Sequence, residues 1–296
     1  MNTDGWHLTE DIDGFLTAAG AFLRSRPARH IMALTMTARL RGPGADRYGP
    51  GATVFGRLER AGAVEAAFYR LPAGSLGLTP LTPARADTLA ARLAALGHSL
   101  PQVSADHATA TAFATAWHRH TGATPTLTKS LRLRRLSTLT PPTPSPPGRP
   151  RVAGDQDRDQ VIRWCQGFAD DVGEAVSMDA ASWPGTRFAD KRYTFWETPD
   201  GTPVSMAGAN PMIDGMVQVD PVYTPSPLRG RGYAAAVTAA VTTAALRAGA
   251  TDTVLFTDAA NPTSNALYER IGYRVLTDWS VYAFEYPGAG AAPEGG

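Results

Sequence analysis

The chain has 296 residues, which is long for one compact domain and suits two domains of about 150 residues. Its formal net charge of +1 excludes the concentrated basic surface of a nucleic-acid-binding protein. The single cysteine, Cys165, excludes an internal disulfide and indicates a reducing compartment. No apolar run approaches the roughly 18 residues of a membrane helix, and the first residues lack a signal-peptide pattern. We therefore expect a cytoplasmic protein with no nucleic-acid or membrane partner.

Prolines crowd the middle of the chain, at positions 141, 142, 144, 146, 147 and 150. Proline removes backbone donors and favours extended polyproline geometry, so neither a helix nor a central strand is expected there. We predict a semi-rigid linker over 141–150; a proline-rich recognition ligand is the alternative. The linker separates predicted domains at 1–140 and 151–287. A Gly/Ala/Pro-rich tail at 288–296 is expected to be disordered.

Hydrophobic periodicity and turn signals predict the same kinds of element in both domains. In the first, helices are expected at 11–24, 28–41, 83–96 and 106–120, and strands at 53–58, 64–71, 76–78 and 126–136. In the second, helices are expected at 155–172, 180–189, 232–248 and 262–271, and strands at 193–196, 203–210, 216–224, 253–257 and 279–286. The nearly matching order of elements indicates a duplicated fold.

The turn between strand 216–224 and helix 232–248 has the composition of a phosphate site. It reads Arg229-Gly230-Arg231-Gly232-Tyr233-Ala234. The glycines allow a tight turn and close backbone approach to a ligand. The unpaired N–H groups at the start of the helix favour phosphate, and the arginines could add charge-assisted contacts. Taken alone, the two glycines are equally explained by an ordinary strand–helix turn.

The helix predicted at 262–271 carries a polar stripe. Asn261, Asn265 and Tyr268 are spaced at i, i+4 and i+7, and Ser264 borders them. Asn261 precedes a proline and suits an N-cap, so capping is a sufficient reason for it. A polar stripe that ends in a tyrosine is unusual on a buried helix unless the stripe faces a ligand. The alternative is that Tyr268 is an ordinary core residue.

The loop and the helix resemble the two central motifs of the Gcn5-related N-acetyltransferase (GNAT) superfamily. The resemblance implies an α/β fold of two tandem GNAT-like domains, each a central mixed, mostly antiparallel sheet flanked by helices. It also implies acetyl-CoA as co-substrate and no metal. The amides of Arg231, Gly232 and Ala234 would hold the pyrophosphate, and Tyr268 would lie near the sulfur. The coenzyme-binding residues that the resemblance implies are Val222, Tyr223, Thr224, Arg229, Gly230, Arg231, Gly232, Tyr233, Ala234, Asn261, Ser264 and Tyr268.

The first half lacks both motifs. At the equivalent place its loop reads Thr79-Pro80-Leu81-Thr82, without glycine or arginine, and no match to the second motif follows. We therefore expect a degenerate first copy and one active site, in the second half.

Direct attack of an amine on a thioester needs a proton acceptor. Freeing the lone pair of an alkylamine of pKa about 10.4 costs about 4–5 kcal/mol at pH 7. All six histidines lie in the first half, so a histidine base would require the first domain to reach across the cleft. The better candidates are the carboxylates of the second half, Asp170, Asp171, Glu174 and Asp214. The sequence does not choose among them. We pair Glu174 with Tyr268, the expected proton donor to the departing thiolate.

These features predict an N-acetyltransferase, a monomer or homodimer, that moves an acetyl group from acetyl-CoA to the primary amine of a small molecule within a ternary complex. One alternative is a protein or peptide N-acyltransferase that acts on lysine or N-terminal amines. The other is a non-catalytic coenzyme A-binding module.

Overall fold

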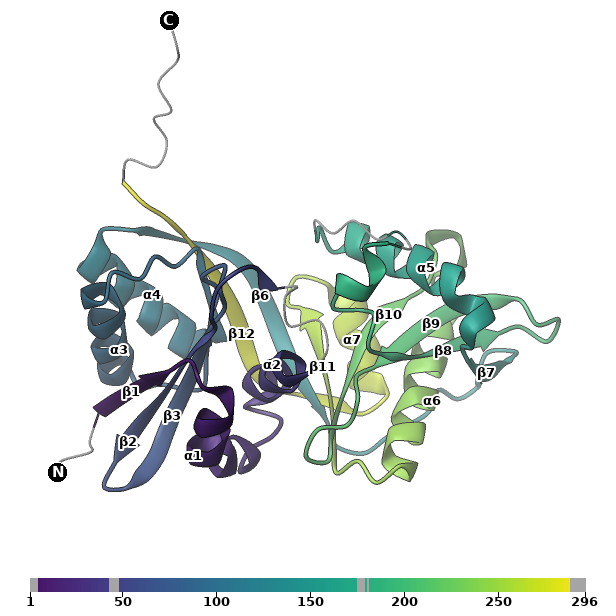
Figure 1. The fold of residues 1–296 in the computed structure, drawn as a ribbon. Helices are drawn as coiled ribbons and strands as arrows, with labels where there is room; N and C mark the ends of the chain where they lie inside the picture. Colours follow the sequence, from purple (N-terminus) through teal and green to yellow (C-terminus); the bar gives the residue numbers. More distant parts are fainter. Residues whose placement is uncertain (1–4, 43–47, 175–178, 180, 288–296) are drawn as a thin grey trace, which may run out of the picture. The chain divides into compact units, whose positions relative to one another are not determined.

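The computed structural model describes residues 5–42, 48–174, 179 and 181–287, so the tail expected at 288–296 lies outside the described residues. The chain forms two compact units, Met1–Arg132 together with Thr277–Gly296, and Leu133–Leu276. Each unit is a mixed sheet flanked by helices, which confirms the predicted fold class (Figure 1).

The first unit has its strands in the order β1-β2-β3-β4-β5-β12-β6. β4 and β5 pair parallel, whereas β1 to β4 pair antiparallel in succession and β5 pairs antiparallel with β12. The strands are β1 (Gly5–Thr9), β2 (Val54–Arg60), β3 (Ala63–Arg70), β4 (Leu76–Leu78), β5 (Gln102–Asp106) and parts of β6 (Thr124–Leu136) and β12 (Tyr273–Glu285). The helices are α1 (Ile12–Arg24), α2 (Ile31–Arg41), α3 (Pro83–Ala95) and α4 (His107–Thr121).

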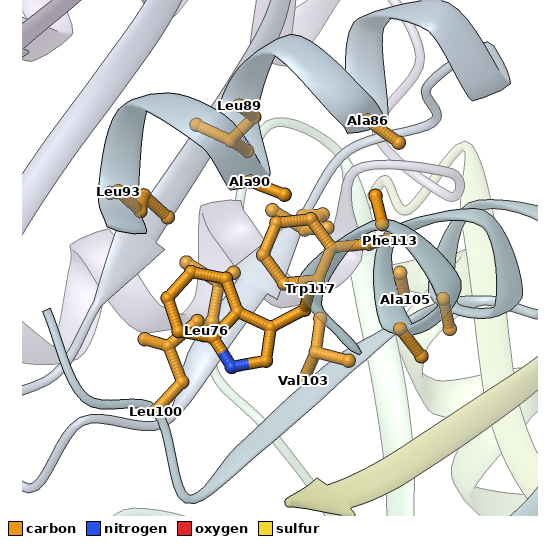
Figure 2. Close-up of a cluster of buried hydrophobic side chains, with 14 of the residues drawn as sticks. Leu76, Ala86, Leu89, Ala90, Leu93, Leu100, Val103, Ala105, Phe113 and Trp117 are labelled. Carbon is orange, nitrogen blue, oxygen red and sulfur yellow. The ribbon is translucent and has the colours of Figure 1, made fainter. Parts of the chain in front are cut away.

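The main core of the first unit lies between its sheet and helices α3 and α4 (Figure 2). Trp117 of α4 is fully buried and stacks on Phe113, with 5.8 Å between ring centroids. Helix α3 buries four residues at the spacing of one helical face, Ala86, Leu89, Ala90 and Leu93. Both helices begin at side-chain caps, Thr82 for α3 and Asp106 for α4, which satisfy N–H groups of the first turn.

The second unit has its strands in the order β6-β11-β10-β9-β8-β7. β10 and β11 pair parallel, and β10, β9, β8 and β7 pair antiparallel in succession. The strands are β7 (Arg149–Val152), β8 (Arg192–Glu197), β9 (Pro203–Ala209), β10 (Met216–Tyr223), β11 (Asp252–Asp258) and the end of β6. The helices are α5 (Arg158–Asp171), α6 (Tyr233–Arg247) and α7 (Pro262–Arg270).

Both faces of this second sheet are covered, with α5 on one face and α6 on the other (Figure 1). Neighbouring residues of β8 and β9 alternate between two cores, as strand geometry requires. Phe195 and Met206 pack under α5, whereas Trp196 and Ala207 pack with α6 and α7. Strands buried on both faces read as nearly continuous apolar runs, and β9, in which Ser205 is the one polar residue, follows that pattern.

Each unit contains a segment from the other half of the sequence. Thr277–Gly296 belongs to the first unit, where β12 pairs with β5 from Trp279↔Asp106 to Ala283↔Gln102. The end of β6, from Leu133, belongs to the second unit and lies next to β11. These boundaries differ from the domains expected at 1–140 and 151–287, because strand pairing rather than the proline segment decides which unit a segment joins.

The segment expected as a linker, 141–150, falls within the second unit. Trp196 Nε1 donates a hydrogen bond to the Pro147 carbonyl oxygen at 3.2 Å. The segment ends in β7, which is the edge strand of this sheet. Proline is compatible with an edge strand because one side of such a strand makes no ladder, so Pro150 does not disrupt the sheet.

Most elements predicted from the sequence are confirmed to within a few residues. The helix predicted at 180–189 is wrong: over its described residues only Trp183–Gly185 form a single 3-10 turn. Pro184 and Gly185 explain this, since both disfavour a helix interior. The short strands β1, β5 and β7 were not predicted. No helix in the described part of the chain is long and apolar enough to cross a membrane.

Candidate active site

The two parallel strands in the middle of the second unit separate toward their carboxyl ends. β10 pairs with β11 only from Met216 to Gln218. The register of β10 on its other neighbour, β9, then shifts between Val219 and Val222. Pro221, which has no N–H to give to a ladder, lies in this irregular stretch. Pairing between β10 and β11 therefore ends before Val222, Tyr223 and Thr224, and these three residues remain predicted contacts of the extended coenzyme arm.

The loop after β10 leads into the first turn of α6. Gly230 and Gly232 have φ of 77° and 82°, in the left-handed region that favours glycine. The first hydrogen bond of the helix runs from Ala236 N to Gly232 O, at 3.1 Å. No side chain caps α6, and among the described residues no hydrogen bond takes up the N–H groups of residues 230–235. This row of amides, which includes Tyr233 and Ala234, suits an anionic group.

Both arginines of the loop are exposed, and each contacts the loop itself. Arg229 Nε donates to the Thr224 carbonyl oxygen at 2.9 Å, and its guanidinium forms an ion pair with Asp171 at the end of α5. Arg231 Nη2 donates to the Pro227 carbonyl oxygen at 3.3 Å. Arg229 therefore supports the shape of the loop in this structure.

The residues at the end of β10 are fixed by neighbours from β9 and α5. Ser205 Oγ donates to the Tyr223 carbonyl oxygen at 3.1 Å and contacts Thr224 Oγ1 at 2.8 Å. The Tyr223 ring lies against α5 at Gly167, where a Cβ atom would come within 2.6 Å of the tyrosine hydroxyl. Trp164 packs on the same ring, with 6.0 Å between centroids. A glycine in α5 therefore makes room for Tyr223.

Tyr268 lies on α7 and is 8% exposed. Its ring meets Tyr273 edge-on, with 6.2 Å between centroids. Burial raises the pKa of Tyr268 well above its ordinary value, Tyr273 and Asp220 raise it further, and Thr238 lowers it slightly. Thr238 Oγ1 is buried without a hydrogen-bond partner among the described residues, so the two hydroxyls lie near each other without hydrogen-bond geometry. The phenol therefore keeps its proton at neutral pH.

The polar residues of α7 have two structural roles, one as the N-cap of the helix and one as a buried hydrogen-bonding side chain. Asn261 is the N-cap, and its Oδ1 accepts from Ser264 N at 2.9 Å. Asn265 is buried, and its Nδ2 donates to the carbonyl oxygens of Asp258, Ala259 and Asn261. Asn265 thus holds the β11–α7 turn in place, which explains its polarity without a ligand. Asn261 and Ser264 remain predicted coenzyme contacts.

A cluster of charged side chains that sequence reasoning missed lies at the irregular stretch of β10. The Asp220 carboxylate accepts from Arg187 and Lys191, and Lys191 Nζ also donates to the Asp220 carbonyl oxygen at 2.9 Å. Arg187 continues to Glu174 with two bonds of 2.8 Å, Nε to Oε1 and Nη2 to Oε2. The signal in the sequence was an acidic residue inside an apolar strand, together with Lys191, one of only two lysines.

The Asp220 carboxylate is held in its charged form. Burial raises its pKa, but the charges of Lys191 and Arg187 outweigh burial and hold the pKa of Asp220 well below its usual range. The Lys191 side chain is 1% exposed, so this pair is screened little by water. A carboxylate with so low a pKa is a poor proton acceptor. Asp220 is therefore suited to ordering its neighbours rather than to acting as a base.

The four carboxylates proposed as bases are placed very differently. Asp214 is exposed in the turn before β10, six residues from Asp220 and so about 20 Å along the strand. Asp170 is exposed and accepts from Gln166, and Asp171 pairs with Arg229. Of the four, Glu174 is the one connected to Asp220, through Arg187.

The equivalent opening in the first unit is closed. Thr109 Oγ1 accepts from Leu81 N at 2.8 Å and donates to Leu81 O at 3.5 Å, and both residues are buried. The helix that follows, α3, is capped by Thr82. Leu81 N and Arg85 N are therefore taken up by the side chains of Thr109 and Thr82, and the degenerate first copy remains a prediction.

Two further groups bear on the chemistry of the second unit. Cys165 lies on the buried face of α5. Its thiol contacts the Tyr193 hydroxyl at 3.3 Å, and burial raises the pKa of the thiol to about 12. A thiol in this state is not a nucleophile at neutral pH. Among the described residues there is no group of three or more His, Cys, Asp or Glu side chains that could hold a metal ion.

Part of the second unit matches the model of a known protein family. The model of the acetyltransferase (GNAT) family matches residues 159–273. The X-ray structure of a Drosophila protein resembles 95% of this chain over 98% of its own length, with a TM-score of 0.61 and 14% identity. A GCN5-related N-acetyltransferase from Sphaerobacter thermophilus gives a TM-score of 0.55 at 17% identity, with 95% of this chain and 96% of that chain covered.

A third solved structure is a tandem GNAT protein from the clavulanic acid biosynthesis pathway. It gives a TM-score of 0.53 at 14% identity, with 94% of this chain and 97% of that chain covered. At these identities the solved structures establish the fold alone. A comparison with curated protein sequences gave no match.

Proposed function

Residues 159–273 belong to the acetyltransferase (GNAT) family, and from this premise we propose that the chain moves an acetyl group from acetyl-CoA to the primary amine of a small molecule. The single observation that carries the proposal is the row of free amides at residues 230–235, at the mouth of the separated strands β10 and β11. The bound coenzyme would supply the acetyl thioester, and Gly232 would allow its pyrophosphate to approach the backbone.

Tyr268 is the proposed proton donor to the departing thiolate. Its raised pKa keeps the phenol protonated at neutral pH, as a general acid requires. The chain has a single cysteine, and burial raises the pKa of the Cys165 thiol to about 12. A covalent acetyl-cysteine route is thereby disfavoured, which supports direct attack by the amine.

Glu174 is the proposed proton acceptor, provided that its carboxylate is released from Arg187 or reached through water. Its carboxylate accepts two charge-assisted hydrogen bonds from Arg187, so both of its oxygens are already engaged. Glu174 can act as a base only when Arg187 moves away or when water relays the proton. Measuring kcat/KM of Glu174→Gln against amines of rising pKa tests this role: a loss that grows with amine pKa supports it, and a change below about threefold across the series contradicts it.

The proposed acceptor is a small molecule because the strands beside the opening are internal. β10 pairs with β9, and β11 lies next to β6. A peptide that binds as an added strand needs a free sheet edge, and the edge strand of this unit is β7, at the far end of the strand order.

The proposal is tested with the full chain, acetyl-CoA, a panel of small amines and a mixture of lysine-containing peptides, by following release of the coenzyme thiol. Small amines should raise the rate of release, and Gly232→Val should abolish the effect. Faster turnover with peptides would show the alternative acceptor class. Coenzyme binding without turnover on any amine would identify a non-catalytic binding module.

A further inference from the structure

A buried arginine from the first half of the sequence lies at the base of the α7 helix. Arg134 is part of β6 and is 2% exposed. It precedes the proline segment, yet it belongs to the second unit. A buried guanidinium must be well satisfied, because leaving such a charge without partners is costly. Its partners therefore show what it organises.

The guanidinium of Arg134 joins three elements around the candidate site. Nη2 donates to Asn265 Oδ1 of α7 at 3.0 Å, and Nε donates to Thr257 Oγ1 of β11 at 3.3 Å. Nη1 donates to the carbonyl oxygen of Tyr273, where β12 begins, at 3.4 Å. Thr257 Oγ1 also donates to Asn265 Oδ1 at 2.8 Å. The planar fork of arginine suits this divergent set, whereas lysine offers a single nitrogen.

These contacts lead to Tyr268 by two routes. Asn265 lies one helical turn before Tyr268 and is fixed on its other side by the carbonyl oxygens of the β11–α7 turn. Tyr273, whose backbone accepts from Arg134, packs edge-on against the Tyr268 ring. The Tyr273 hydroxyl in turn contacts Thr242 of α6 at 2.7 Å. Arg134 thus constrains both the helix that carries the phenol and the ring beside it.

We propose that Arg134 is a positioning residue for Tyr268, so that the first half of the chain contributes to the active site even though its own coenzyme site is closed. The proposal rests on the proposed acetyltransferase function. Arg134 acts through Asn265 and Tyr273 on the direction of the phenol, and the phosphate loop at the start of α6 lies outside its contacts. Loss of Arg134 should therefore impair the proton donation step and spare coenzyme binding.

The test is a double-mutant cycle in the full chain with Arg134→Met and Tyr268→Phe. A misplacement of about 1 Å can cost about 10²-fold in rate, so Arg134→Met should lower kcat about 10- to 100-fold. The Kd for acetyl-CoA should change less than about threefold. The kcat of the double variant should be close to that of Tyr268→Phe. Arg134 acts by orienting the Tyr268 hydroxyl, so its loss has little further effect once that hydroxyl has been removed. Arg134→Lys should recover part of the loss.

The matched control is Arg135→Met, one residue along the same strand. Arg135 points to the opposite face, is half exposed and pairs with Asp252, so its replacement should leave kcat unchanged. If Arg134→Met keeps kcat within threefold of the natural chain, or if the two losses multiply in the double variant, Arg134 has no positioning role. Should Arg134→Met fail to fold, Arg134→Lys enters the same cycle with the same criteria.

Hydrogen exchange separates a failure of this proposal from a failure of the proposed function. Arg134→Met, or Arg134→Lys in its place, should speed amide exchange in α7 and leave α6 unchanged, whether or not any amine is acetylated. Unchanged exchange in α7 overturns the positioning role. Absence of turnover in the natural chain with every amine overturns the function alone.

Discussion

Replacing Tyr268 by phenylalanine removes one hydroxyl and leaves the packing of the ring intact. None of the hydrogen bonds among the described residues involves this hydroxyl, and the buried Thr238 Oγ1 also has no hydrogen-bond partner among them. A typical intramolecular hydrogen bond contributes about 0.5–1.5 kcal/mol to stability. Because no such bond is lost, Tyr268→Phe should change the free energy of unfolding by less than about 1 kcal/mol. A loss of activity would then report chemistry rather than unfolding.

The expected loss is large. General acid catalysis contributes about 10²–10⁴-fold, which corresponds to about 2.7–5.5 kcal/mol in the activation free energy. The kcat of Tyr268→Phe should fall by that factor, while the Kd for acetyl-CoA stays within about twofold. Burial raises the pKa of the phenol well above 10, so in the natural chain its proton should not be lost below pH 10. The kcat of the natural chain should therefore not fall between neutral pH and pH 10 through ionisation of Tyr268. Any fall in that range should also be present in Tyr268→Phe.

The assay combines thiol release in the steady state with a pre-steady-state acyl-transfer measurement. If kcat changes less than about threefold and the transfer step itself is unchanged, Tyr268 is a packing residue and the reasoning is refuted. If only the transfer step slows, product release limits kcat and the acid role stands. If coenzyme binding is abolished, the hydroxyl positions the coenzyme and another group is the acid.

Three further predictions follow from the site. Gly232→Val should raise the Kd for acetyl-CoA at least tenfold, because the φ of 82° at position 232 is strained for valine. Arg229→Ala should raise the same Kd less than about fivefold. The reverse order of the two Kd values in calorimetry would show that side-chain charge controls binding. Calorimetry of the full chain should give a stoichiometry of one acetyl-CoA per chain. A stoichiometry of two would show that the first unit also binds the coenzyme, which would contradict a degenerate first copy. Asp220→Asn should cost roughly 3–5 kcal/mol at pH 7, because it removes the carboxylate charge opposite the buried Lys191 ammonium and the Arg187 guanidinium. The pKa of Asp220 is lower in the folded chain than in the unfolded chain, so its contribution to stability is complete above about pH 4 and is lost on further acidification. Urea unfolding of the natural chain and of Asp220→Asn measures this contribution at each pH. An equal difference in unfolding free energy at pH 2.5 and pH 7 would contradict the ion-pair origin.

The local signals in the sequence were sufficient for the loop and helices of the candidate site. Glycines at 230 and 232 after a proline-ended strand predicted the start of α6, and Asn261 before a proline predicted the cap of α7, because both rest on backbone geometry within a few residues. The helix expected at 180–189 fails for an equally local reason, the pair Pro184 and Gly185.

The exchange of segments between the two units could not be read from the sequence. An edge of a sheet accepts any strand of suitable pattern, so periodicity alone does not tell which sheet β12 joins. The buried partners of charged residues are hidden for the same reason. Arg134 lies 131 positions from Asn265, and Arg187 lies 33 positions from Asp220. In the sequence such residues have the same appearance as solvated surface charges.

The most direct test of the central claim is the fate of a labelled acetyl group. The full chain is incubated with acetyl-CoA labelled in the acetyl carbons and with the amine that best stimulates thiol release, and the products are examined by mass spectrometry and NMR. The account predicts one labelled acetyl group on the amine nitrogen for each coenzyme thiol released, with no label retained on the protein. Label on Cys165, on an oxygen of the acceptor or on no acceptor at all would contradict direct acetyl transfer to an amine.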